Sequence, residues 1–465
     1  MNLRDSLESL RDFWKEFVKV KQGLVGLGLL VVFVLLGIFG TLAVPFPGAI
    51  DHWRDIAFWQ DNPQAAPPVW TNLFARKKGV VSAVLQGKGI EGTSQGFRTK
   101  TITFDYHYGY DRPPRDLIVG FQAKGALVVD MSLVRPDGLE ALCFSQQLSF
   151  GSGDKRRVAL ARNSSGAVVE FVRGQDEYLA ANLNPDLISP MAILFSKIDE
   201  NLVDSPVPLK GDYKLKVTAT LPTPESWIGE ESLIVSGHVS GALGTDISKR
   251  DIYTGVVVGI RWALIIGILT SVITVLVGVV FGVTAAYFGG IVDWCLSRLY
   301  ELIYLMPVLP FLIVIAAIFK PSIWTLIIII CLFFWSGVYK PVYSMALQIK
   351  EETYVEASRA LGSGKWRIIF KHIVPILLPY SFAVMALSIP GIIVYEASVS
   401  ILGLGDATKV TWGQILNDAL GQGAVINQLW WWVVPPGLMI ALMGMSFAFL
   451  GTALDKILHP KLKTR

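Results

Sequence analysis

Long apolar runs separated by polar stretches dominate this chain of 465 residues. A helix that crosses a bilayer needs about 20 consecutive, mostly apolar residues. Six runs reach this length: residues 23–45, 254–288, 294–319, 322–346, 373–402 and 429–454. The pattern therefore predicts an α-helical membrane protein with six transmembrane helices in a lipid bilayer.

The residues ahead of the first run have the period of an amphipathic helix. Five apolar side chains share one helical face: Leu7, Leu10, Trp14, Phe17 and Val18. Such a helix is expected to lie in the membrane interface over residues 1–22. Residues 22–50 carry no charge, a run too long for the core of a signal peptide, so we expect no cleavable signal here.

Residues 46–242 have a different pattern, in which apolar and polar positions alternate between Gly and Pro turns. Three stretches show it most clearly: TKTITFDYHYGYD (99–111), ALVVDMSLVRPDG (126–138) and GDYKLKVTATL (211–221). We therefore expect a mainly β, sandwich-like domain from about residue 80 to 242, inserted between the first and second transmembrane helices.

The distribution of basic residues predicts the orientation. Lysine and arginine cluster in residues 1–22, in the loop 347–372 and at the C-terminus, whereas the loop 403–428 has only Lys409. Basic flanks stay on the cytoplasmic side of a membrane. Both termini and the loop 347–372 are thus expected in the cytoplasm of a multi-pass protein of the plasma or inner membrane, with residues 46–242 extracytoplasmic.

Composition agrees with a membrane protein and narrows the chemistry. The chain is 52% hydrophobic and 17% charged, and its net charge of +4 gives no reason to expect nucleic-acid binding. Of its three cysteines, only Cys143 lies outside the apolar runs, so the region 46–242 can hold no internal disulfide.

Residues 354–375 read as two short amphipathic helices joined at Gly362 to Gly364. Tyr354, Ala357, Ser358 and Leu361 share one face of the first helix, and Trp366, Ile369, Phe370 and Ile373 share one face of the second. We expect the bulky second face to pack on the protein's own helix ends and the first helix to dock on a partner. The alternative is an ordinary loop folded against its own bundle.

These residues also carry a resemblance to a family. Glu356-Ala357-Ser358, Gly362 and Ile373-Val374-Pro375 resemble the EAA loop of permeases from binding-protein-dependent ABC importers. Four further motifs, in order, are similar to the dipeptide, oligopeptide and nickel permease branch: LGTDISKRD (243–251), AAYFGGIVD (285–293), SILGLG (400–405) and LGTALDKILHPKLK (450–463). Lys249 stands where that family usually has glycine.

The resemblance implies a six-helix permease that forms half of a translocation pathway. Its implied partners are a second homologous permease, two ATP-binding subunits or domains, and an extracytoplasmic substrate-binding protein. Contacts with the ATPase would come from Tyr354, Glu356, Ala357, Ser358, Leu361 and Gly362. Packing of the loop would come from Trp366, Ile369, Phe370, Ile373 and Pro375. Peptides are the leading substrate class and oligosaccharides the alternative.

The chain lacks the motifs of nucleotide binding and hydrolysis. It contains no GxxxxGK[ST] or HExxH, and its five histidines have no metal-ligand spacing. We therefore expect no enzyme activity, catalytic residue, metal or cofactor in this chain, with ATP and Mg²⁺ on the partner ATPase. A receptor or assembly scaffold with an ectodomain is the alternative of another class.

Charged residues within the apolar runs need a specific explanation. Glu396 is a candidate pathway or gate residue or, as we favour, a packing anchor hydrogen-bonded to neighbouring helices. Arg261 has the same two interpretations, and extension to the membrane interface is favoured over substrate contact. Arg298 and Glu301 are three residues apart on a helix and are expected to pair.

Overall fold

A computed structural model describes residues 11, 13–46, 48–94 and 96–458, and divides into two compact units. The helical unit comprises the chain up to Arg54 and from Tyr253 onward, and the β-rich unit is Asp55–Ile252. These bounds differ from the predicted 46–242. Trp53 is buried in the helical unit, while Ala65 donates a hydrogen bond to the carbonyl of Asp246 in the β-rich unit. Leu7 and Leu10 of the expected interfacial helix, and residues 459–463, lie outside the described residues.

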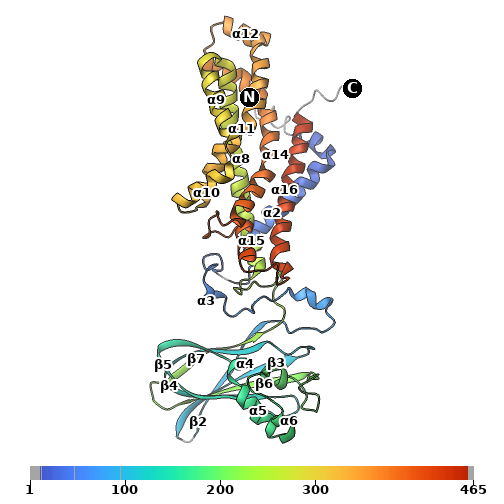
Figure 1. The fold of residues 1–465 in the computed structure, drawn as a ribbon, viewed down its shortest axis with the longest axis vertical. Helices are drawn as coiled ribbons and strands as arrows, with labels where there is room; N and C mark the ends of the chain where they lie inside the picture. Colours follow the sequence, from blue (N-terminus) through green and yellow to red (C-terminus); the bar gives the residue numbers. More distant parts are fainter. Residues whose placement is uncertain (1–10, 12, 47, 95, 459–465) are drawn as a thin grey trace. The chain divides into compact units, whose positions relative to one another are not determined.

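Five helices of the described chain are long and apolar enough to cross a membrane. They are α2 (Lys21–Leu42), α8 (Ile252–Phe288), α11 (Ile323–Lys350), the continuous stretch Lys365–Ile401 that contains α14 (Val374–Ile401), and α16 (Trp430–Leu458). Figure 1 shows α2 beside α16, and Ser446 Oγ of α16 donates a 2.8 Å hydrogen bond to the Gly26 carbonyl of α2.

The run predicted as one helix over 294–319 is broken. It forms α9 (Gly290–Leu305) and α10 (Val308–Ile318), which meet at 83°. Met306 is extended, with φ −73° and ψ 127°, as is expected of a residue that precedes a proline. The structure thus has five apolar helices and one bent pair among its described residues, and the pair counts as a sixth span only if both halves belong to it.

Small residues on α8 let other helices approach it closely. A Cβ at Gly259 would lie 2.5 Å from the indole of Trp412 in α15 (Trp412–Gly421), and one at Gly278 would lie 2.6 Å from Val338 in α11. Small residues at helix interfaces are a typical source of packing between transmembrane helices.

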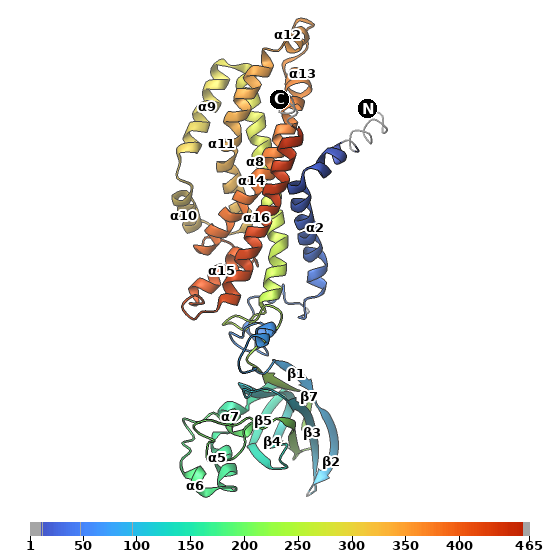
Figure 2. The ribbon, with the colours of Figure 1, turned by 90° about the vertical axis from the view of Figure 1, so that its right-hand side faces the viewer.

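The β-rich unit is built on one seven-stranded antiparallel sheet, with the order β1-β7-β4-β6-β3-β2 and β5 on the other edge of β4 (Figure 2). Its strands are β1 (Ala83–Gln86), β2 (Lys88–Ser94), β3 (Phe97–Tyr108), β4 (Asp116–Val134), β5 (Glu140–Ala159), β6 (Gly211–Leu221) and β7 (Trp227–Ser236). The three stretches predicted as strands fall on β3, β4 and β6.

The sheet differs from the expected two-sheet sandwich because β4 changes partners along its length. Asp116–Lys124 pairs with β7, whereas Val128–Val134 pairs with β6. Between these segments Gly125 has a φ of +80°, which glycine adopts without strain and which lets the strand bend. The strands β1 and β7 therefore join one segment of β4, and β6, β3 and β2 join the other, around one core.

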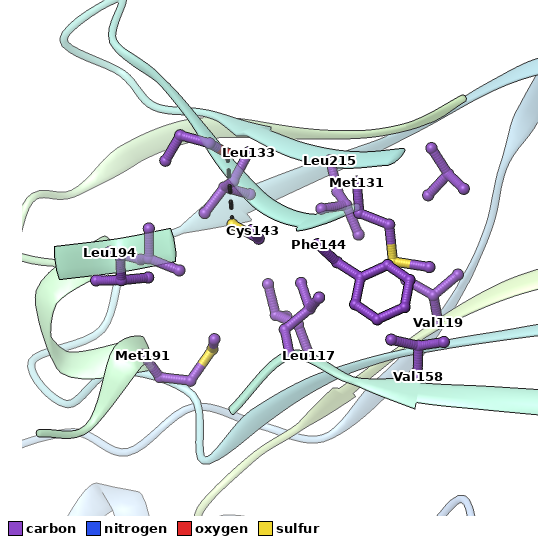
Figure 3. Close-up of a cluster of buried hydrophobic side chains, with 14 of the residues drawn as sticks. Leu117, Val119, Met131, Leu133, Cys143, Phe144, Val158, Met191, Leu194 and Leu215 are labelled. Atoms are coloured by element: carbon purple, nitrogen blue, oxygen red, sulfur yellow. Dashed lines mark hydrogen bonds between the residues drawn. The ribbon is translucent and has the colours of Figure 1, made fainter. Parts of the chain in front are cut away.

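Short helices that the alternating pattern did not predict cover part of this core. They are α4 (Leu160–Asn163), α5 (Ser165–Arg173), α6 (Glu177–Ala181) and α7 (Pro190–Leu194), and the lead-in to the sheet contains α3 (Ile56–Trp59) and a 3₁₀ turn, η1 (Val69–Leu73). Figure 3 shows Met191 and Leu194 of α7 on one side of the strand residues Leu117, Leu133 and Cys143. Burial raises the pKa of the Cys143 thiol to about 12, so this thiol is protonated and unreactive at neutral pH.

Candidate functional site

The predicted pair of short helices is present between α11 and α14. The segment consists of α12 (Thr353–Ala360), a turn from Leu361 to Gly364, α13 (Lys365–Ile368) and the π-helix η2 (Ile369–Ile373). Figure 1 shows α12 at the end of the helical unit that α9 and α11 also reach. We call residues 353–373 the candidate coupling loop.

Gly362 ends the first helix, as the sequence predicted. Its φ is +78°, and its amide donates to the carbonyl of Arg359 at 3.0 Å, while the amide of Ser363 donates to the carbonyl of Ser358 at 3.1 Å. These two bonds define a Schellman motif, which fixes the direction in which the chain leaves the helix. The turn is therefore a defined structural element.

A buried face attaches the candidate coupling loop to the helical unit. Val355, Ile368, Ile369 and Ile373 are buried in a cluster with α8 and α11, whose members include Val279, Val283, Val342 and Ala346. Burial of apolar side chains on both halves of the loop therefore anchors it to the ends of α8 and α11.

Cations reinforce this attachment at the C-terminal end of α8. The Arg359 guanidinium lies 5.9 Å from the ring centre of Tyr287, and Lys365 Nζ lies 5.6 Å from that of Phe288. Lys350 Nζ donates a 3.1 Å hydrogen bond to the Ala286 carbonyl, where the negative end of the helix dipole favours a cation.

The second predicted face is only partly correct. Ile369 and Ile373 are buried as expected, but Trp366 and Phe370 remain 55% and 54% exposed, and Pro375 is exposed. Ile368 is buried in their place, and Phe370 lies in the π-helix, whose residue spacing differs from that of an α-helix. Trp366 still touches the unit, because its ring lies 5.5 Å from that of Phe288.

The first helix exposes most of its predicted contact residues. Tyr354, Glu356, Ala357, Leu361 and Gly362 are exposed. Ser358 is buried instead, with its Oγ 3.4 Å from His372 Nε2. Partial burial, and then the charge of Glu352, raise the pKa of the Tyr354 phenol, so its hydroxyl stays available as a hydrogen-bond donor. The loop thus exposes four large apolar side chains: Tyr354, Leu361, Trp366 and Phe370.

Glu396, in contrast to the exposed residues of the loop, is buried inside the protein. The residue is only 6% exposed. Its Oε1 accepts hydrogen bonds from Ser400 Oγ at 2.8 Å and from Thr411 Oγ1 at 2.9 Å. Gly413 packs against Ser400, since a Cβ there would lie 2.6 Å from Ser400 Cβ. This placement favours the anchor interpretation. Arg261 is exposed on α8, in contrast to Glu396.

Sequence reasoning missed two polar links in the helical unit. Arg54 Nη1 donates to both carboxylate oxygens of Asp418 in α15, at 2.9 and 2.8 Å, and its Nε donates to the Ala407 carbonyl at 2.9 Å. Asp406 accepts from the backbone amide of Ile323, at the start of α11, at 3.2 Å. Arg54, Asp406 and Asp418 lie outside the predicted apolar runs and bind partners distant in sequence, so no spacing pattern indicated these links. The predicted pair of Arg298 and Glu301 is confirmed.

Comparisons with known proteins agree with the motifs. Residues 278–464 match the family described as binding-protein-dependent transport system inner membrane component, and residues 9–68 match the N-terminal TM domain of oligopeptide transport permease C. Residues 69–277 lie outside both matches.

Three relatives show how similar the chain is to known permeases. The dipeptide transport system permease protein DppC of Bacillus subtilis is 34% identical over 221 residues, which cover 47% of this chain and 68% of the relative. The oligopeptide transport system permease protein OppC of Haemophilus influenzae is 32% identical over 47% of this chain and 70% of its own length. The peptidoglycan transport system permease protein YejE of Agrobacterium fabrum is 29% identical over 55% of this chain and 70% of its own length.

Proposed function

Because the chain belongs to the family of binding-protein-dependent transport system inner membrane components, we propose that it is a permease subunit of an ATP-driven importer of peptides. It is a transport subunit and not an enzyme. The substrate class is carried by the names of its relatives, which transport dipeptides and oligopeptides. Oligosaccharides are the competing class, and the receptor or scaffold hypothesis does not account for the family match.

One structural observation supports the coupling role. The candidate coupling loop buries one side against α8 and α11 and exposes Tyr354, Glu356, Ala357 and Leu361 on the other. A partner that binds the exposed side and moves would pull on two apolar helices at once. In this proposal the loop is the lever through which a cytoplasmic ATPase changes the access of the pathway.

The remaining parts of the assembly follow from this role. A second homologous permease would complete the pathway, two ATP-binding subunits or domains would hold ATP and Mg²⁺, and an extracytoplasmic binding protein would deliver substrate. We place both termini and the candidate coupling loop in the cytoplasm and the β-rich unit outside. The bent pair α9 and α10 would then supply the sixth span.

Co-purification of the tagged chain after mild detergent extraction tests the assembly. We expect a Walker-motif ATPase and a second permease in the mass spectrum. Leu361→Asp should remove the ATPase, because Leu361 is 87% exposed on the proposed contact surface, while Leu187→Asp, at a leucine 83% exposed in the β-rich unit, should retain it. Recovery of the chain alone, or of a signalling protein in place of an ATPase, would overturn the proposal.

Uptake by the reconstituted assembly tests the substrate. Labelled trialanine should enter proteoliposomes in an ATP-dependent manner, whereas maltotriose should not. Uptake of maltotriose alone would replace peptides by oligosaccharides and leave the coupling role intact.

A further inference from the structure

A trough in the β-rich unit has no part in the coupling role. Its volume is about 660 Å³, within the range of about 300–1,000 Å³ that is typical of small-ligand pockets. All its lining residues belong to Asp55–Ile252, the unit that the family matches largely leave out.

The strand register explains why the surface is hollow here. Arg157 of β5 pairs with Gly120 of β4, Gly120 with Ser232 of β7, and Ser232 with Gln86 of β1. Directly paired residues of neighbouring strands share a face of the sheet. The two central positions of this row, Gly120 and Ser232, have no side chain or a small one. The residues at its two ends have long polar side chains. Gly120 and Ser232 therefore form a floor between Arg157 and Gln86.

A β-bulge places a carboxylate at one end of this floor. Gly120 pairs with Ser232 but Gln122 pairs with Gly229, so Glu230 and Glu231 together oppose a single residue of β4. Glu230 lines the trough with a φ of +49° and pairs with Lys155 at 3.2 Å. Glu231 instead pairs with Lys100 at 2.5 Å. Bulges and strained non-glycine residues concentrate where a strand must aim a side chain at a ligand.

Both signs of charge and several amides line the trough. Arg157 Nη2 lies 2.5 Å from Asp61 Oδ1, and Lys155 pairs with Glu230, whereas Arg156 has no ion-pair partner among the described residues. Gln60, Gln86 and Gln122 supply carboxamides. A short unblocked peptide has one carboxylate, one ammonium group and amide bonds between them. Arginine and lysine side chains can bind the peptide's carboxylate, and Glu230 and Asp61 can bind its ammonium group. The carboxamides can both donate hydrogen bonds to the amide bonds of the peptide and accept hydrogen bonds from them.

We propose that this trough binds short peptides through both charged termini, so that the β-rich unit is itself a substrate-recognition domain of the permease. The choice of peptides as the ligand class rests on the function proposed above. The trough itself rests on the register, the bulge and the charges of the β-rich unit alone.

Equilibrium dialysis of the purified full-length chain with labelled trialanine tests this inference. We expect saturable binding, and at least about tenfold weaker binding of N-acetyl-trialanine amide, which lacks both charges. Gly120→Leu should fill the floor, since a Cβ there already lies 3.1 Å from Ser232 Oγ, and should weaken trialanine binding about tenfold or more. Gly92→Leu is the matched control, because Gly92 lies on the exposed strand β2 outside the trough.

A charge variant keeps the test valid if Gly120→Leu does not fold. Glu230→Gln removes the carboxylate with little change of volume and should weaken trialanine binding about five- to tenfold. Equal binding by wild type, Gly120→Leu and Glu230→Gln, or no difference between trialanine and its blocked analogue, would overturn the inference.

The failure of this inference is separable from the failure of the proposed function. If the reconstituted assembly takes up trialanine but binding ignores both trough variants, the trough assignment is wrong and the transport function stands. If both variants weaken binding but no peptide is transported, the trough stands and the transport function is wrong.

Discussion

The tripeptide Glu-Ala-Ser occurs in both the candidate coupling loop and the membrane core, and the two copies have opposite environments. In α12, Glu356 is exposed and Ser358 is buried, whereas in α14 Glu396 is buried and Ser398 is exposed. Both helices end in a Schellman motif, at Gly362 with φ +78° and at Gly403 with φ +81°. The same local sequence thus gives the same local structure in two different environments, because the neighbouring helices decide which side of each helix is covered.

The largest expected effect comes from Gly362→Pro. Proline fixes φ near −65° and has no amide hydrogen for the Arg359 carbonyl, so the Schellman motif cannot form. We expect ATP-driven trialanine uptake to fall at least about tenfold, because the lever loses its direction. The measurement is uptake in proteoliposomes, with the amount of the chain in the membrane quantified in parallel.

Gly362→Asn serves as the control for that variant. Asparagine tolerates the left-handed conformation far better than proline and keeps the amide, so uptake should remain close to wild type. Wild-type uptake by the Gly362→Pro variant would contradict the proposed coupling role of the turn that follows α12.

Glu396→Leu should have the next largest effect, and it should act on stability. The change leaves the hydroxyls of Ser400 and Thr411 buried without their acceptor, each at a cost of roughly 1–3 kcal/mol. We expect a lower thermal midpoint in detergent. Glu396→Gln keeps an oxygen acceptor and should lie much closer to wild type. Normal stability with lost uptake in both variants would instead make Glu396 a pathway residue.

A matched pair of substitutions compares the two turns directly. Gly362→Ala and Gly403→Ala each force an alanine into the left-handed region, at a cost of about 1 kcal/mol. Neither new Cβ meets a clash: Gly362 has open space, and Gly403 faces Asn417 Nδ2 at 3.8 Å. Similar losses of unfolding free energy are therefore expected, measured by denaturant titration. A cost several times larger at Gly403 would show that its turn is held by packing and not by backbone conformation alone.

The smallest expected effect on stability belongs to Glu356→Gln. This exposed side chain makes no buried contact, so the free energy of unfolding should stay within about 0.5 kcal/mol of wild type. Retention of the partner ATPase on co-purification should nevertheless decrease, because a charged contact at the proposed interface is lost. If the variant is destabilised but retains the ATPase fully, Glu356 has a structural role, as we favour for Glu396.

The sequence predicted the apolar helices, the three main strands and the turn at Gly362, because each depends on a short-range pattern. It did not predict the break at Met306 and Pro307, although the proline is a known breaker, since the apolar run continues across it. It also assigned Trp366 and Phe370 to the buried face, whereas the structure buries Ile368 and leaves both aromatic side chains exposed.

Lys249 departs from the glycine that the family resemblance leads us to expect, and only the structure shows how this affects the turn before α8. The residue adopts a φ of +66° there. Its Nζ donates a 3.0 Å hydrogen bond to the Gln60 carbonyl and its own carbonyl accepts from Asn62. The turn therefore keeps the conformation that glycine favours, and side-chain contacts offset the strain.

The sequence by itself determined where helices and strands form, where α12 ends and which family the motifs resemble, because residue spacing and glycine conformations act locally. Only the tertiary structure decided that Glu396 is enclosed by Ser400 and Thr411, that Arg54 pairs with Asp418, and that Gly120 and Ser232 floor a charged trough. These arrangements join residues from different elements, and their energies depend on burial and distance, which appear only when the chain has packed.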